Sequence, residues 1–250
     1  MASEPVLRVE KLVKTFGAFR ALDEFSFDVH GGEILGLVGP NGSGKTTSIN
    51  VVSGLYAPSG GTIHLGGKPI GGLKSHKIVH LGVNRTFQIP KPFMQLTARE
   101  NVDVARAYGS GHERSPPAER LLADLNLASV ADRPAIELNS AQQKMLDLAR
   151  ALATGPRLLL VDELAAGLNP AELDWIAERL RLLARSGMAV VVVEHLMGFI
   201  EQVTDRVIVL NAGREIFGGT LAQAVQDPRV VEVFLGKSNA ASLGSGHVDA

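Results

Sequence analysis

Short, wholly apolar segments recur along the chain, with amphipathic segments between them. Residues 34–38, 158–161, 188–193 and 207–210 are apolar runs of this kind. Runs without alternation are typical of parallel strands that are buried on both faces of a sheet. Because helical segments separate these runs, the pattern predicts an α/β fold with a parallel sheet, in which functional residues lie at the carboxyl ends of the strands.

The first part of the chain contains strands of mixed polarity. Residues 6–13 and 25–29 mix apolar and polar side chains at roughly the period of a strand, which predicts half-exposed strands. Residues 62–65, followed by two glycines, predict a hairpin strand, and residues 81–88 predict another short strand.

Capping residues mark where the predicted helices begin and end. A helix over residues 45–53 is closed by Gly54. From about residue 90 to 140 the pattern predicts a mainly helical insert. Two helices begin in this insert, at the capping box Thr97–Glu100 and at Pro116–Pro117. Two more follow it: Ser140, with Gln143 reaching back, begins a helix to about Ala153, and Asn169–Glu172 begins one that ends near Gly187.

A glycine-rich loop follows the strand at residues 34–38 and matches G-x-x-x-x-G-K-[ST] at every fixed position. A strand that turns into a helix through glycines leaves backbone N–H groups pointing into one concave site, where the helix dipole favours a polyphosphate. We expect the lysine to reach the β- and γ-phosphates, and the first threonine to bind Mg²⁺. The loop consists of Gly39, Pro40, Asn41, Gly42, Ser43, Gly44, Lys45, Thr46 and Thr47.

Polar residues also follow three other predicted strands. An acid directly after a buried strand suits a water-mediated Mg²⁺ ligand, here Asp162, and the next acid, Glu163, suits a group that polarises the attacking water. The alternative is that both acids cap the next loop. A histidine considered alone is more often structural. His195, however, follows a buried strand and lies on the rim formed by the carboxyl ends of these strands, so it is a candidate sensor of the γ-phosphate. Gln88 ends the fourth strand of this rim.

Three further side chains have two interpretations each. Phe16 precedes a glycine, so it is either an exposed ring that stacks on a nucleobase or an ordinary core residue. His76 and His80 have the spacing of a metal pair on a helix, but no further ligand lies nearby in the sequence, which favours surface residues.

Composition narrows the classes of function. The chain has 250 residues, 45% hydrophobic residues and a net charge of −1, which predicts one globular unit and disfavours nucleic acid as a partner. The absence of cysteine excludes disulfides and thiolate chemistry. We find neither a leader sequence nor an apolar run long enough to span a membrane, so we expect a soluble, cytosolic type of protein that meets a membrane only through a partner.

Together these residues resemble an ABC transporter ATP-binding subunit, over about residues 6–236. The resemblance implies a P-loop NTPase fold with a RecA-like parallel sheet core, a small antiparallel β subdomain and a helical insert. It also implies one domain, residues 1–236, and a flexible tail, residues 237–250. The matching residues are Phe16, 39–47, Gln88, 138–142, Asp162, Glu163, 166–169 and His195. Within the family, residues 85–88, 165–170 and 233–236 look like those of high-affinity branched-chain amino acid importers.

The family resemblance implies a role for each residue. Phe16 would stack on adenine, and Gln88 and Asp162 would meet Mg²⁺. Glu163 would be the catalytic base, and His195 would contact the γ-phosphate. Residues Asn139, Ser140, Ala141 and Gln142 would act in trans, closing the nucleotide site of a second subunit.

The sequence departs from the family at two places. Ala141 replaces the second glycine of the signature, and Asn139 replaces its serine. This departure has two interpretations. The methyl group of Ala141 can obstruct the approach of the backbone to the partner's γ-phosphate. Alternatively, the capped helix still directs its dipole at that phosphate, and function survives with a modest loss of activity. Leu164 stands where the family usually has proline. This replacement loosens the turn after Glu163.

The resemblance also implies partners and a location. They are a membrane permease, a second ATPase subunit in a homodimer or heterodimer, and indirectly an external solute-binding protein, with this chain on the cytoplasmic face of the cell membrane. Closure around ATP would be transmitted to the permease through the groove around residues 88–100. The sequence leaves open three alternatives: the ATPase of a lipid-type exporter, a soluble ABC protein, and a regulatory subunit that binds ATP and hydrolyses it weakly.

Overall fold

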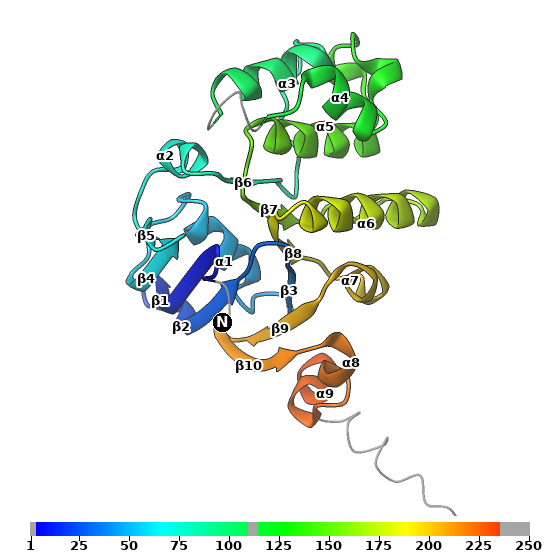
Figure 1. The fold of residues 1–250 in the computed structure, drawn as a ribbon. Helices are drawn as coiled ribbons and strands as arrows, with labels where there is room; N and C mark the ends of the chain where they lie inside the picture. The colour runs from blue at the N-terminus through cyan, green and yellow to red at the C-terminus, as the bar shows by residue number, and fades with distance from the viewer. Residues whose placement is uncertain (1–3, 110–114, 236–250) are drawn as a thin grey trace, which may run out of the picture.

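A six-stranded sheet lies at the centre of the computed structural model, which describes residues 4–109 and 115–235 (Figure 1). Its strands lie in the order β10–β9–β3–β8–β7–β6. All are parallel except β10, which pairs antiparallel with β9. The parallel sheet predicted from the apolar runs is therefore confirmed. The strands are β3 (Ile34–Val38), β6 (Val83–Arg85), β7 (Leu158–Asp162), β8 (Ala189–Val193), β9 (Arg206–Asn211) and β10 (Arg214–Gly219).

The two faces of this sheet contact two different hydrophobic cores. Leu159 and Val161 of β7 pack against one core, and Leu158 and Leu160 pack against the other. This alternation explains why the strand is apolar at every position. The first core contains residues of α5 (Ser140–Ala153), α6 (Pro170–Arg185) and α7 (Met197–Val203), and the second contains residues of α1 (Lys45–Val52).

An antiparallel sheet covers α1 on its other side, with strand order β2–β1–β4–β5. Its strands are β1 (Leu7–Phe16), β2 (Phe19–Val29), β4 (Gly60–Leu65) and β5 (Lys68–Pro69). The strands predicted at 6–13 and 25–29 were too short, because the ladder continues through bulges until Phe16 pairs with Phe19. Phe16 is therefore the last residue of a strand, with the turn at Gly17 after it.

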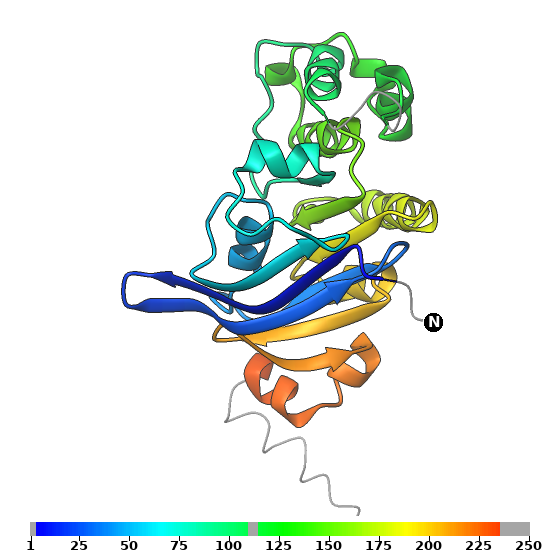
Figure 2. The same cartoon turned by 60° about the vertical axis from the view of Figure 1, so that its left-hand side comes forward.

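A group of helices forms the end of the molecule opposite α8 (Leu221–Ala224) and α9 (Pro228–Leu235), as Figure 2 shows. It contains α3 (Ala98–Ala107), α4 (Ala118–Asp124) and the 3-10 turns Ala128–Val130 and Ala135–Glu137. The predicted capping box is present, because the Thr97 side chain accepts from the Glu100 amide and Glu100 binds back to Thr97. The helical insert expected between residues 90 and 140 is thus confirmed.

The strand predicted over residues 81–88 was too long, because β6 ends at Arg85. The amide of Thr86 still donates to Leu160 of β7, but the amide of Phe87 donates to the Asp147 carboxylate on α5. Gln88 therefore lies beyond the end of the strand, and a side-chain hydrogen bond directs the chain away from the sheet.

Several short elements gave no clear signal in the sequence, among them α2 (Ser75–His80), α7, α8 and β10. His76 and His80 are exposed on α2, which agrees with their interpretation as surface residues. The tail predicted at 237–250 lies outside the described residues. Among the residues that are described, no helix is long and apolar enough to cross a membrane.

Candidate active site

The glycine-rich loop connects β3 to α1 and folds around the lysine that follows it. Lys45 Nζ donates to the carbonyl oxygens of Gly39 and Pro40, at 2.8 and 2.9 Å. Gly39 has φ +147°, and a Cβ there would lie 2.2 Å from the Leu210 carbonyl oxygen, so only glycine fits. Burial lowers the pKa of Lys45, while the charges of Glu163 and Asp162 oppose this shift.

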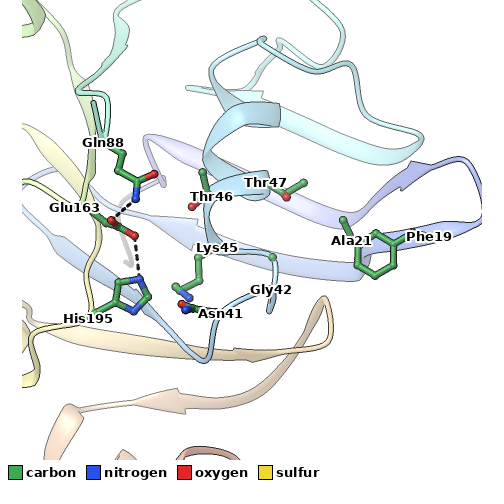
Figure 3. Close-up of a pocket in the computed structure, with 11 residues that line it drawn as sticks. Phe19, Ala21, Asn41, Gly42, Lys45, Thr46, Thr47, Gln88, Glu163 and His195 are labelled. Carbon is green, nitrogen blue, oxygen red and sulfur yellow. Dashed lines mark hydrogen bonds and ion pairs between the residues drawn. The ribbon is translucent and has the colours of Figure 1, made fainter. Parts of the chain in front are cut away.

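A pocket of about 600 Å³ opens above this loop, and Figure 3 shows its lining. Glu163, Gln88 and His195 come together on one side, Lys45 faces them, and Phe19 lies at the far end. The first N–H groups of α1 have no partner within the helix, so this end of the pocket attracts anions. The lining residues are Phe19, Ala21, Asn41, Gly42, Gly44, Lys45, Thr46, Thr47, Gln88, Glu163 and His195.

Glu163 is held between two side chains from the segments that follow β6 and β8. Gln88 Nε2 donates to Glu163 Oε2 at 2.5 Å, and His195 Nε2 lies 2.9 Å from Glu163 Oε1. Glu163 itself has φ +49°, a left-handed conformation that is uncommon for a residue with a side chain. Glu163 is therefore in direct contact with both Gln88 and His195, which the sequence placed on the same rim.

Asp162 lies behind Glu163 and is almost fully buried. Its Oδ2 forms an ion pair with Arg85 Nη2 at 3.0 Å, while its Oδ1 is buried without a hydrogen-bond partner among the described residues. Burial raises the pKa of Asp162, and the Arg85 charge opposes the rise. One carboxylate oxygen thus remains for a further ligand. This oxygen, the Thr46 hydroxyl and the amide oxygen of Gln88 are donors of the kind that Mg²⁺ prefers, and binding of Mg²⁺ by these residues stays a prediction.

Two aromatic rings are candidates for contact with a base. Phe16, predicted to stack on adenine, packs edge-to-face with Tyr56, with ring centroids 5.3 Å apart, while Phe19 lines the pocket. The two phenylalanines are register partners across the β1–β2 hairpin, so their side chains lie on the same face of the sheet. Adenine stacking by Phe16 stays a prediction, and Phe19 joins it as a second candidate.

Residues 139–142 lie at the start of α5, away from this pocket. The predicted N-cap, Ser140, was wrong: Asn139 caps the helix, its Oδ1 accepting from the Gln142 amide at 2.8 Å. Gln143 instead donates to the Leu138 carbonyl. Asn139, Ala141 and Gln142 line a separate pocket of about 200 Å³, beside Trp175. Their predicted role, in trans at a second subunit's nucleotide, stays a prediction.

Sequence reasoning assigned no role to three buried charged groups, Lys144, Asp147 and Glu194. Lys144 donates to main-chain carbonyls after β7, and Glu194 accepts from the amide of Ala165. Burial raises the pKa of Glu194 to about 7 and that of Asp147 to about 6. Only Glu194, an acid directly after an apolar strand, carried a signal of the kind used for Asp162.

A comparison with models of protein families identifies the family of this chain. The family described as ABC transporter matches residues 22–166. The chain belongs to the ABC transporter family. Membership of this ATPase family means that the chain binds nucleotide and hydrolyses ATP, as expected from the phosphate loop and the acids after β7.

Similar proteins cover nearly the whole chain. The high-affinity branched-chain amino acid transport ATP-binding protein BraF of Pseudomonas aeruginosa is 35% identical over 94% of this chain and all of its own length. A probable branched-chain amino acid transport ATP-binding protein LivG of Archaeoglobus fulgidus is 37% identical over 92% of this chain and 95% of its own.

Solved structures agree with the fold. The ADP conformation of MJ1267, an ATP-binding cassette of an ABC transporter, has a TM-score of 0.83 and 30% identity, covering 94% of this chain and all of that one. A nucleotide-free ATP-binding cassette from an ABC transporter has a TM-score of 0.81 and 29% identity, with the same coverage. The expected cassette fold, with a parallel core, an antiparallel sheet and a helical insert, is therefore confirmed.

Proposed function

We propose that this chain is the ATP-hydrolysing subunit of an importer for branched-chain amino acids or a related small solute. The observation that carries the ATPase part is the position of Glu163, held by Gln88 and His195 on the rim that faces Lys45. The solute is supported by relatives named for branched-chain amino acid transport, which match almost all of this chain.

In this proposal the phosphate loop, the Mg²⁺ ligands and Glu163 have separate roles in ATP hydrolysis. Lys45 and the amides of the loop bind the phosphates, and Mg²⁺, held by Thr46, Gln88 and Asp162, would neutralise the charge of the phosphates. Glu163 orients the attacking water and takes up its proton. Gln88 and His195 each occupy one lone pair of the Glu163 carboxylate in this structure, and the carboxylate keeps further lone pairs that can accept from the water.

The same proposal assigns the partners. Two ATPase subunits enclose two ATP molecules, and residues 139–142 of this chain face the nucleotide of the other subunit. The dimer binds a membrane permease at the cytoplasmic face, and a solute-binding protein delivers the solute to that permease from outside. Since Ala141 carries a methyl group at the approach to the phosphate, we expect this chain alone to bind ATP well and hydrolyse it slowly.

The test of the solute is uptake of radiolabelled leucine by cells of the source organism that lack this gene. We expect uptake to return with the wild-type gene and with the exposed control Glu201→Gln, but not with Glu163→Gln. Normal leucine uptake in the deletion strain would refute leucine as the solute. Equal rescue by Glu163→Gln, at equal protein levels, would refute the role of ATP hydrolysis.

A further inference from the structure

The chain directly after β7 is held from two sides by buried charged side chains. Lys144 Nζ donates to the carbonyl oxygens of Glu163 and Leu164, each at 3.1 Å, and also to that of Ala166. From the other side, Glu194 Oε1 accepts from the Ala165 amide at 2.7 Å. Lys144 is 8% exposed and Glu194 is 2% exposed. We call residues 163–166 the post-base loop.

Burying these two ionisable side chains costs free energy, which argues that they have a function. Burial lowers the pKa of Lys144 and raises that of Glu194, and both shifts express the free energy needed to keep a charge away from water. No neutral side chain has three donors on one atom, so only an ammonium group can bind three carbonyl oxygens at a single point. The lysine therefore fixes the relative positions of three peptide groups.

The conformation fixed in this way belongs to the base itself. Glu163 has φ +49°, and the residue after it is Leu164, whose φ is free to vary where a proline would restrict it. Without restraint, the strand end could relax to a conformation with negative φ, which would move the Glu163 carboxylate away from Gln88 and His195. One of the three carbonyls that Lys144 binds is that of Glu163 itself.

Lys144 and Glu194 also connect the loop to two functional segments. Lys144 is on α5, close to the residues 139–142 that begin this helix, and Glu194 directly precedes His195. We propose that Lys144 and Glu194 are positioning residues for ATP hydrolysis, which hold the post-base loop so that the Glu163 carboxylate stays on the catalytic rim. Neither residue lines the nucleotide pocket, so they act on turnover and not on ATP binding.

The test separates positioning from simple stability by measuring kcat, KM and ATP affinity together, well below the midpoint of thermal unfolding. We expect Lys144→Met to lower kcat at least tenfold with the Kd for ATP within about twofold of wild type, since small misplacements of a catalytic group can cost about a hundredfold. Lys144→Arg, which keeps several donors, recovers part of this loss. The matched control is Lys77→Met, at an exposed lysine on α2.

The acid is tested by a pair of substitutions. Glu194→Gln keeps an acceptor oxygen for Ala165, so its kcat at neutral pH stays within about threefold of wild type, whereas Glu194→Leu lowers kcat at least tenfold. Hydrogen exchange at the Ala165 amide supplies a measurement that needs no turnover. We expect faster exchange in Glu194→Leu and near wild-type exchange in Glu194→Gln.

Three results would overturn the proposal. The first is a folded Lys144→Met or Glu194→Leu protein with wild-type kcat. The second is a parallel loss of ATP affinity and kcat, which would show a general effect on the fold. The third is unchanged exchange at the Ala165 amide in Glu194→Leu, which decides the matter even where turnover is too slow for kcat to be measured.

Discussion

Replacing Glu194 by glutamine should change how the stability of the protein depends on pH. In the folded protein, burial raises the pKa of Glu194 from 4.5 to about 7. Between these two values the folded state keeps a proton that the unfolded state has released. The free energy of unfolding therefore falls as pH rises from about 4.5 to 7.

The size of this effect follows from the two pKa values. At about 1.4 kcal/mol for each pH unit between them, ionisation of Glu194 reduces the stability of the wild type by up to about 3 kcal/mol. Glutamine keeps an oxygen for the Ala165 amide and does not ionise. Asp147 has a pKa raised to about 6 and contributes a similar slope, but it is present in both proteins and cancels in the comparison.

The assay is urea unfolding of both proteins, followed by circular dichroism between pH 4.5 and 8. The stability of Glu194→Gln relative to wild type should rise across this range by up to about 3 kcal/mol. A difference that stays constant with pH, or that falls, would refute the argument that Glu194 is buried with a raised pKa.

Three further changes test other parts of the site. Arg85→Met leaves Asp162 buried without its partner and should reduce the free energy of unfolding by about 3–5 kcal/mol in urea titrations. The control Arg99→Met removes exposed ion pairs and should reduce the free energy of unfolding by less than about 1 kcal/mol. Equal losses in the two variants would contradict the role of burial. Ala141→Gly should increase ATP turnover at unchanged ATP affinity, measured by phosphate release, and a decrease would show that the methyl group is not an obstruction. Replacing both Phe16 and Phe19 by alanine should raise the Kd for ATP about tenfold in calorimetric titrations, given about 1–3 kcal/mol for a stacked base, and an unchanged Kd would exclude base stacking on this hairpin.

The candidate residues for ATP binding and hydrolysis could be predicted from the sequence because each follows an apolar run that forms a strand. The loop ending in Lys45, the acid Glu163 and His195 were all placed on one rim by this argument, and the structure brings them to one pocket. Gln88 also lies there, although β6 ends before it. The length of that strand depends on a bond from Phe87 to Asp147, which is distant in the sequence and leaves no local pattern.

Other features were ambiguous or invisible in the sequence. Asn139 with Gln142 and Ser140 with Gln143 both fit a capping box, and a choice between two overlapping matches cannot be made from spacing alone. Lys144 looks like a polar position of an amphipathic helix, because the carbonyls that it binds belong to a loop nineteen to twenty-two residues later. Its role becomes visible only when α5 packs beside the end of β7.

The central claim, that Glu163 is the base of an ATPase site, is tested most directly by steady-state ATP hydrolysis together with ATP binding. We would compare the wild type, Glu163→Gln and the exposed control Glu201→Gln, adding the partner subunits if the chain alone is slow. The account predicts that Glu163→Gln abolishes hydrolysis and keeps wild-type affinity for ATP, while the control keeps both. Hydrolysis by Glu163→Gln at the wild-type rate would contradict it.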